Sequence, residues 1–203
     1  MTAADASLAR AGIDLVHRFD ARAVASALSL PALAAAPVGV LIGNTRALWE
    51  PFLAARRADP ALRATRDPIE LYVERAVAAA FPGAPAMFSH RRYGGAFLPF
   101  QRVAVAAGVG ALAPIGLVIH PVYGPWFALR AIVMCDGSPP ATGEVPLACR
   151  CEAPCLDAVT RAQAGRDWRL WLAVRDACPR GREHRYSDAQ CRYHYAHDPY
   201  ALE

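Results

Sequence analysis

The chain has 203 residues, of which 55% are hydrophobic and 20% charged, and its net charge is +4. Scattered arginines and so small a net charge exclude the dense basic patch of a nucleic-acid-binding protein, and no apolar run reaches the roughly 20 residues of a membrane-spanning helix. The N-terminus lacks the basic start and apolar core of a signal peptide. We therefore expect one cytoplasmic domain over residues 1–203, with 1–12 and 196–203 at its periphery.

Helical and strand-like segments alternate in the first half of the chain. Asn44 and Thr45 follow an apolar strand-like run, and their side chains are suited to cap the next helix. Asp67 and Pro68 repeat this pattern, with Asp67 as N-cap and proline at the first helical position. The expected helices cover Ala3–Ala11, Asp20–Leu28, Thr45 to about Arg57, Pro68–Phe81 and Phe100–Ala107, and the expected strands cover Ile13–Val16, Val38–Ile42 and Ala86–Ser89.

Two strand-like runs, Leu117–His120 and Trp126–Met134, are joined by the turn residues of Pro121–Pro125. This pattern predicts a hairpin. The small residues and glycines around it allow either close approach of a flat ligand or tight packing of a helix on the hairpin, and both readings remain open. A helix over Asp167–Asp176 and a polar, aromatic tail over Tyr186–Tyr200 complete the chain.

Six cysteines are expected to be reduced or reactive rather than disulfide-bonded in the cytoplasm. Three of them cluster with gaps of one and three residues, whereas metal and iron–sulfur sites usually begin with a two-residue gap. Free or mutually oxidisable thiols are therefore the preferred reading, and no metal ligand is predicted. The clustered cysteines are Cys149, Cys151 and Cys155, and a fourth ligand would have to come from Cys135, Cys178 or Cys191.

The segment Ile119–Val133, which reads I-H-P-V-Y-G-P-W-F-A-L-R-A-I-V, resembles the MMACHC-like family of cobalamin-processing proteins. Further similar stretches follow the family's order, at Asn44–Leu53, Arg66–Ile69, Arg175–Ala177 and Arg185–Gln190. The resemblance covers about residues 13 to 195. It implies an α+β fold of the flavin-reductase-like (nitroreductase-like) class, with an antiparallel sheet flanked by helices, and cobalamin (vitamin B12) bound base-off.

The resemblance also implies site residues and a reaction. Arg130 and Arg175 would hold the carboxylates of a thiol substrate such as glutathione, because a guanidinium group can bind a carboxylate through two hydrogen bonds. The upper axial ligand would leave by thiol-dependent dealkylation or by reductive decyanation with FMN or FAD. The residues expected along the corrin and its nucleotide tail are Gln101, Val105, Gly108, Gly116, Val118, His120 and Tyr186.

Several alternatives stay open. His120 also suits a satisfied histidine at a strand end, Arg175 a solvated helix face, and Arg130 a strand-end charge. The short link Ala111–Ile115 and Val105, where the family has a histidine, depart from the family pattern. The cysteine cluster resembles epoxyqueuosine reductase, which implies a cobalamin-dependent oxidoreductase with an iron–sulfur cluster. A B12 chaperone without turnover is the non-enzymatic alternative, and a homodimer is expected in either case.

Overall fold

The computed structural model describes residues 2–141 and 153–202. The chain divides into two compact units, each of which combines segments that are distant in the sequence. Unit 1 comprises Met1–Val109 with Ala128–Glu144, and unit 2 comprises Gly110–Phe127 with Val145–Glu203. The expected single domain over residues 1–203 stays a prediction.

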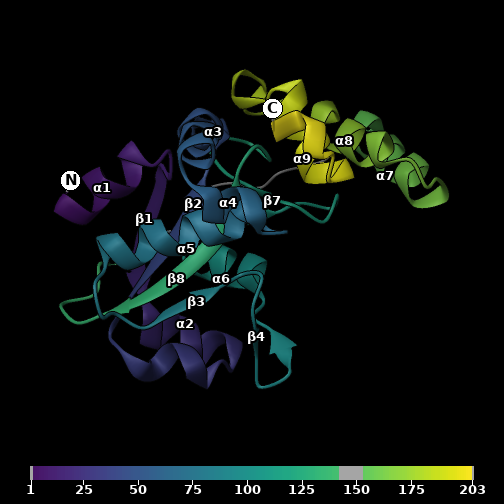
Figure 1. Cartoon of the computed structure of the whole chain (residues 1–203). Helices are drawn as coiled ribbons and strands as arrows, with labels where there is room; N and C mark the ends of the chain where they lie inside the picture. The colour runs from purple at the N-terminus through teal and green to yellow at the C-terminus, as the bar shows by residue number, and fades with distance from the viewer. Residues whose placement is uncertain (1, 142–152, 203) are drawn as a thin grey trace. The chain divides into compact units, whose positions relative to one another are not determined.

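Unit 1 contains a four-stranded sheet in the order β1-β2-β8-β3, in which all neighbouring strands are antiparallel (Figure 1). Every residue of β2, one of the two interior strands, is buried. Both faces of the sheet are therefore covered, which explains why β2 reads as a continuous apolar run instead of an alternating one. The strands are β1 (Leu15–Asp20), β2 (Val38–Asn44), β3 (Ala86–Phe88) and β8 (Ala128–Cys135).

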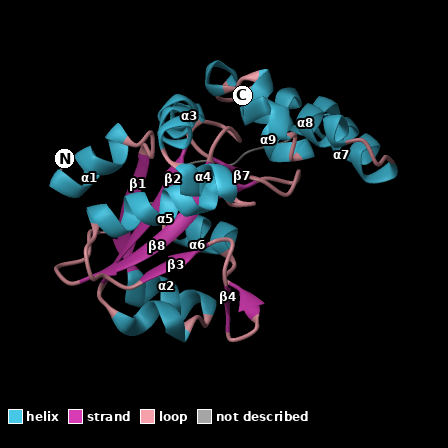
Figure 2. Cartoon of the chain, viewed as in Figure 1, coloured by secondary structure: helices cyan, strands magenta, loops and turns pink. Residues whose placement is uncertain are grey.

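In unit 1, α5 packs against α1, α3 and α4, and α2 packs against α6 (Figure 2). A small hairpin of strands β4 (Arg92–Tyr93) and β5 (Ala96–Phe97) follows β3. The helices are α1 (Ala3–Arg10), α2 (Ala21–Leu28), α3 (Trp49–Ala58), α4 (Pro60–Ala64), α5 (Pro68–Ala80) and α6 (Phe100–Ala106), and the 3-10 turns are η1 (Pro31–Ala35) and η2 (Arg46–Leu48).

Several of these helices begin where the sequence predicts. The Asp20 side chain accepts a hydrogen bond from the Ala23 amide at 2.9 Å, so that β1 ends and α2 begins at one residue. Pro68 is the first residue of α5, as expected, but the Asp67 side chain makes no capping hydrogen bond. Asp67 is thus the N-cap residue of α5, as predicted, and the helix starts where expected, but without a side-chain hydrogen bond at the cap.

Unit 2 consists of a two-stranded hairpin and a helical segment in which α7 packs on α8 and α8 on α9. None of the helices in the described part of the chain is both long and apolar enough to span a membrane. The elements are β6 (Ala111–Leu112), β7 (Val118–Ile119), α7 (Ala153–Ala164), α8 (Trp168–Ala177), η3 (Arg182–His184), α9 (Asp188–Ala196) and η4 (Pro199–Leu202).

The hairpin predicted between Leu117–His120 and Trp126–Met134 is wrong. Strand β7 pairs with β6, whereas β8 pairs with β2 and β3. Only one bridge, between His120 and Gly124, joins residues across the intervening turn. Proline has no N–H to donate to a ladder, and prolines stand on both sides of this turn, at 121 and 125.

Candidate functional site

Arg130 lies at a β-bulge in unit 1. In the pairing of β2 with β8, Ile42 is opposite Ala131 and Gly43 is opposite Leu129, so Arg130 is the unmatched residue on that side. A bulge bends the strand and redirects the side chain of the extra residue, and bulges are frequent beside active sites. The register shift therefore gives Arg130 a direction that regular alternation along β8 would not give it.

The Arg130 guanidinium group is largely buried, with 12% of the side chain exposed. Its Nε donates to Asn44 Oδ1 at 2.7 Å, and Nη1 lies 3.7 Å from Glu70 Oε1 on α5. Nη2 is buried and has no hydrogen-bond partner among the residues that the structure describes. Because a buried donor without a partner is costly, this nitrogen is suited to receive an acceptor atom of a ligand.

Asn44 is itself fixed by a chain of hydrogen bonds within unit 1. It is fully buried, and its Nδ2 donates to the Thr45 carbonyl oxygen at 2.8 Å. The Thr45 amide and hydroxyl donate to the two carboxylate oxygens of Asp14, at 2.8 and 2.6 Å. The prediction that Asn44 caps a helix is wrong, because its side chain orients Arg130. Thr45 does cap, since its hydroxyl accepts from the Ala47 amide.

Arg175 on α8 has a different environment, within unit 2. Its guanidinium carbon lies 5.8 Å from the centre of the Trp126 ring, 5.9 Å from Tyr186 and 5.8 Å from Tyr195. Arg175 forms no salt bridge with any residue of the described ranges. The rings stabilise the cation by cation–π attraction but leave its charge uncompensated. An anionic ligand would supply the missing carboxylate.

A second arginine beside the same tryptophan shows the contrast. Arg185 lies 5.6 Å from the Trp126 ring centre, and it donates to Asp176 at 2.7 Å and to Asp188 at 2.9 Å. These two carboxylates raise the pKa of Arg185 above its usual range. Of the two guanidinium groups that face Trp126, Arg185 is thus neutralised within the protein and Arg175 is the one available to a ligand.

Tyr186 belongs to the aromatic surround of Arg175. It is 3% exposed and packs edge-on against Trp126, with ring centres 5.6 Å apart. The indole nitrogen of Trp126 is buried and lacks a hydrogen-bond partner in the described part of the chain. Burial raises the pKa of Tyr195, which keeps that phenol neutral. The aromatic side chains around Arg175 therefore carry no negative charge that would pair with Arg175 in place of an anionic ligand.

The predicted corrin-binding residues of unit 1 lie along α6 and at its end. Gln101 and Val105 are four residues apart on this helix, so they share a face, and both are exposed. Gly108 has a φ of 83°, and its amide donates to the Val105 carbonyl oxygen at 3.0 Å, where the helix ends. Both exposed side chains are accessible to a ligand, and their contact with a corrin stays a prediction.

The predicted residues of unit 2 lie on the β6–β7 hairpin and just beyond it. Gly116 is exposed in the turn, with a φ of 77°, and Val118 is buried in β7. His120 Nδ1 accepts hydrogen bonds from the amides of Val122 and Tyr123, at 3.1 and 3.2 Å. With Nδ1 as acceptor, the neutral ring carries its hydrogen on Nε2. This geometry supports a structural role for His120 in the turn, and its role at the corrin stays a prediction.

Two glycines in unit 2 bring the turn after β7 against the segment after α8. A Cβ atom on Gly124, which has a φ of 55°, would lie 2.1 Å from the Arg180 carbonyl oxygen. A Cβ atom on Gly181, which has a φ of 66°, would lie 2.3 Å from the Tyr123 carbonyl oxygen. The glycine of the Pro121–Pro125 turn thus permits close contact between two backbones within the protein.

The cysteines of the described residues do not gather at one place. Cys155 on α7 and Cys178 after α8 belong to one apolar cluster, and Cys191 packs with Trp126 and Tyr186. Burial raises the pKa of Cys135 and of Cys191, which disfavours their thiolate forms. No group of three or more metal-binding side chains occurs within residues 2–141 and 153–202. Cys149 and Cys151 lie outside these ranges.

Sequence reasoning identified Arg130, Arg175 and Tyr186 as site residues but did not identify Asn44, Glu70 or Trp126. Arg130 lies with Asn44 and Glu70, and Arg175 lies with Trp126 and Tyr186. Because the two arginines belong to different units, their convergence on one ligand stays a prediction. Asn44 was predicted only as a helix cap. A polar side chain at the end of a buried strand can also form a hydrogen bond to the neighbouring strand, as Asn44 does with Arg130.

No family model and no curated protein matches this sequence. Among solved structures, the chain is similar to a C. elegans B12-trafficking protein, CblC, which is a homologue of human MMACHC. The TM-score is 0.67 at 15% sequence identity, and the match covers 98% of this chain and 92% of that one. The predicted α+β, nitroreductase-like fold with an antiparallel sheet flanked by helices is therefore confirmed. At 15% sequence identity, this likeness shows a shared fold.

Proposed function

We propose that this protein is an MMACHC-like enzyme that binds cobalamin base-off and removes its upper axial ligand with a thiol. The observation that carries the proposal is the likeness of nearly the whole chain to the fold of a B12-trafficking protein. The segment Ile119–Val133, which resembles the family most closely, supports it from the sequence alone. On this proposal, Gln101, Val105 and Gly108 contact the corrin from unit 1.

The two arginine environments support a thiol that carries carboxylates, such as glutathione. Arg175 offers a cation without a carboxylate partner in the described ranges, and Arg130 offers a buried nitrogen without an acceptor there. Arginine stays protonated, so neither residue exchanges a proton with the substrate. Their role is to bind the carboxylates and to orient the sulfur, which lowers the entropic part of the barrier.

With an alkylcobalamin, the thiolate sulfur would form a bond to the alkyl carbon as the cobalt–carbon bond breaks. The electron pair of that bond stays on cobalt, and the products are a thioether and reduced cobalamin. Exclusion of the lower base favours this outcome, because cobalt without that ligand is easier to reduce. Cys135 and Cys191, whose burial disfavours their thiolates, are poorly suited to supply the sulfur, and on this proposal the thiol comes from a separate substrate.

The binding step is tested by titrating methylcobalamin with the protein and recording the visible spectrum. We expect the base-on spectrum to change to the base-off spectrum as the protein approaches one equivalent. An unchanged spectrum in the presence of excess protein would contradict the proposal at its first step.

The chemical step is tested with methylcobalamin and glutathione under anaerobic conditions. We expect S-methylglutathione to accumulate, and Arg175→Ala to lower its formation at least tenfold at subsaturating glutathione. Arg169→Ala is the matched control, because Arg169 lies on the same helix with 68% of its side chain exposed. Binding of cobalamin without any thioether would instead assign the protein as a chaperone.

A further inference from the structure

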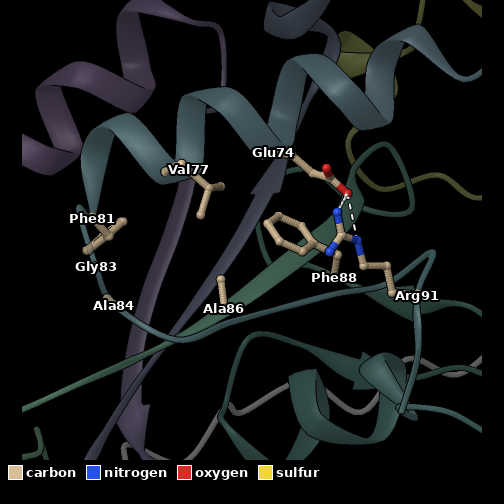
Figure 3. A pocket seen from close by; sticks show the side chains of 9 residues that line it. Glu74, Val77, Phe81, Gly83, Ala84, Ala86, Phe88 and Arg91 are labelled. Atoms are coloured by element: carbon tan, nitrogen blue, oxygen red, sulfur yellow. Dashed lines mark hydrogen bonds and ion pairs between the residues drawn. The ribbon is translucent and has the colours of Figure 1, made fainter. Parts of the chain in front are cut away.

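A cavity of about 270 Å³ lies in unit 1 between helix α5 and the edge strand β3 (Figure 3). It is below the 300–1,000 Å³ of typical small-molecule pockets and suits a single side chain. The walls are mainly apolar, and Glu74 and Arg91 lie at one side. The apolar side chains that line the cavity include Val77, Ala78, Phe81, Ala86 and Phe88.

Strand β3 is the last strand of the sheet, and its register shows which backbone groups face outward. The Ser89 amide donates to the Arg130 carbonyl oxygen, and the Met134 amide donates to the Pro85 carbonyl oxygen, both at 2.9 Å. Residues 85, 87 and 89 therefore direct their hydrogen-bonding groups toward β8. Ala86 and Phe88 direct their N–H and C=O groups to the open edge.

The outward groups of Phe88 already have partners. Its N–H donates to the Tyr93 hydroxyl at 2.6 Å, and its carbonyl oxygen accepts from the Arg91 amide at 3.1 Å. The corresponding groups of Ala86 have no hydrogen-bond partner among the described residues. The edge of β3 is thus closed at Phe88 and open at Ala86.

The open position and the cavity are related by the geometry of a β-sheet. A strand residue placed opposite Ala86 in a hydrogen-bonded pair would exchange both an N–H and a C=O bond with it. Its side chain would project from the same face of the sheet as the Ala86 side chain. Because Ala86 lines the cavity, the same residue would place its side chain there, against Val77 and Phe81.

The charges beside this edge favour an acidic partner. Arg91 donates to Glu74 Oε1 at 2.9 Å, and His90 also contacts that oxygen, at 2.7 Å. Arg92 stacks on the Phe97 ring at 4.7 Å and forms no salt bridge within the described ranges. Among the described residues, Arg91 is therefore paired with a carboxylate and Arg92 is not, and the unpaired positive charge of Arg92 would attract acidic residues beside the strand.

We propose that the edge of β3 binds one extended, acidic segment of a partner protein, which adds a short strand opposite Ala86 and inserts one apolar side chain into the adjoining cavity. Backbone hydrogen bonds would give the affinity and the cavity the side-chain preference. A three-residue strand with capped groups at Phe88 is well protected from general aggregation. The single open position at Ala86 limits pairing to a short segment.

The test uses a fluorescein-labelled eight-residue peptide with a central leucine, threonines beside it and aspartates at both ends. Binding is followed by fluorescence anisotropy, and hydrogen exchange of the Ala86 amide by NMR. We expect the peptide to slow Ala86 exchange at least tenfold, while the Met87 amide, which faces β8, is already protected. A peptide with aspartate in place of leucine, or with lysines at both ends, should bind at least fivefold more weakly.

Three variants locate the bound peptide on the protein. Ala78→Glu places a charge in the cavity and should weaken peptide binding at least fivefold. Ala79→Glu, one residue along the same exposed helix surface, is the matched control and should bind as the wild type does. Ala86→Pro removes the outward N–H, which no described residue uses, and should also weaken binding.

The proposal is overturned if the leucine peptide does not bind at millimolar concentration, or if Ala78→Glu and Ala79→Glu bind it equally well. Binding that leaves Ala86 exchange unchanged would show that the peptide does not pair with β3 at Ala86 and would also overturn the proposal. The methylcobalamin spectrum reports cobalamin binding separately from peptide binding. None of these variants changes a residue proposed to contact cobalamin or glutathione.

Discussion

The two units hold their key arginines by opposite means. In unit 1, Arg130 is fixed by a buried amide, with Glu70 3.7 Å from its guanidinium group. In unit 2, Arg175 is surrounded by aromatic rings and has no described carboxylate partner. Polar contacts fix both position and direction, whereas rings stabilise a cation with little constraint on its direction. Arg130 therefore contributes to the fold as well as to the proposed site, and Arg175 mainly to the site.

Arg130→Ala is the strongest test of this difference. The substitution leaves the Asn44 side-chain carbonyl oxygen buried without its donor, so we expect the free energy of unfolding to fall by about 3 kcal/mol. Arg175→Ala should cost about 1 kcal/mol or less, because it removes only ring contacts. Urea denaturation of both variants measures the two costs. Equal losses would mean that the two environments are energetically alike.

Gly124→Ala tests whether the close backbone contact between Gly124 and Arg180 stabilises unit 2, which has only a two-stranded sheet. Alanine at a φ of 55° is strained, and its Cβ would overlap the Arg180 carbonyl oxygen. We expect a loss of about 2 kcal/mol, measured by thermal unfolding. Gly116→Ala is the control, because it has a similar φ of 77° and open space around the Cβ position. A loss no larger than that of the control would show that the backbone contact contributes little.

Arg175→Lys separates the charge at the proposed thiol site from the shape of the guanidinium group. Lysine keeps the positive charge but cannot bind a carboxylate through two parallel hydrogen bonds. We expect about tenfold weaker glutathione binding, or ~1.4 kcal/mol, with the free energy of unfolding nearly unchanged. Isothermal titration calorimetry measures the affinity. Undiminished affinity would indicate that Arg175 acts as a point charge only.

The sheet strands and most helices of unit 1 were predictable because apolar periodicity and local capping act over a few residues. Pro68 at the start of α5 and the buried run of β2 are examples. Helix α9 was missed, although Ser187 and Gln190 had the spacing of a capping box, and the Ser187 side chain does accept from the Gln190 amide. The polar composition of Tyr186–Tyr200 had led to the prediction of a tail without a helix, despite this capping pattern.

The environment of Arg130 could not be predicted from the sequence. The bulge depends on the register between β2 and β8, which are separated by more than 80 residues in the chain. Strand β8 likewise pairs with β2 and β3, which are distant in the sequence, and not with β7. Long-range register therefore explains both the wrong hairpin and the misread Asn44, while the resemblance to a known family located the arginines.

The smallest expected effect concerns a charge pair of unit 1 that lies near the surface. Asp5 accepts from Arg18 at 2.7 Å, and this hydrogen bond, as the main cause, lowers the pKa of Asp5 from 3.8 to about 2. A lowered pKa in the folded state stabilises the protein above pH 3.8, and the contribution is lost as the pH falls toward 2. Because Arg18 is partly exposed, solvent screening reduces the contribution to about 1 kcal/mol. The free energy of unfolding, measured between pH 5 and pH 2, should therefore decline less steeply for Asp5→Asn than for the wild type.

Arg175 makes no such carboxylate pair among the described residues. The free energy of unfolding of Arg175→Ala should therefore decline with falling pH as steeply as that of the wild type. A less steep decline for this variant would reveal an acidic partner of Arg175 and end the contrast between the two arginines.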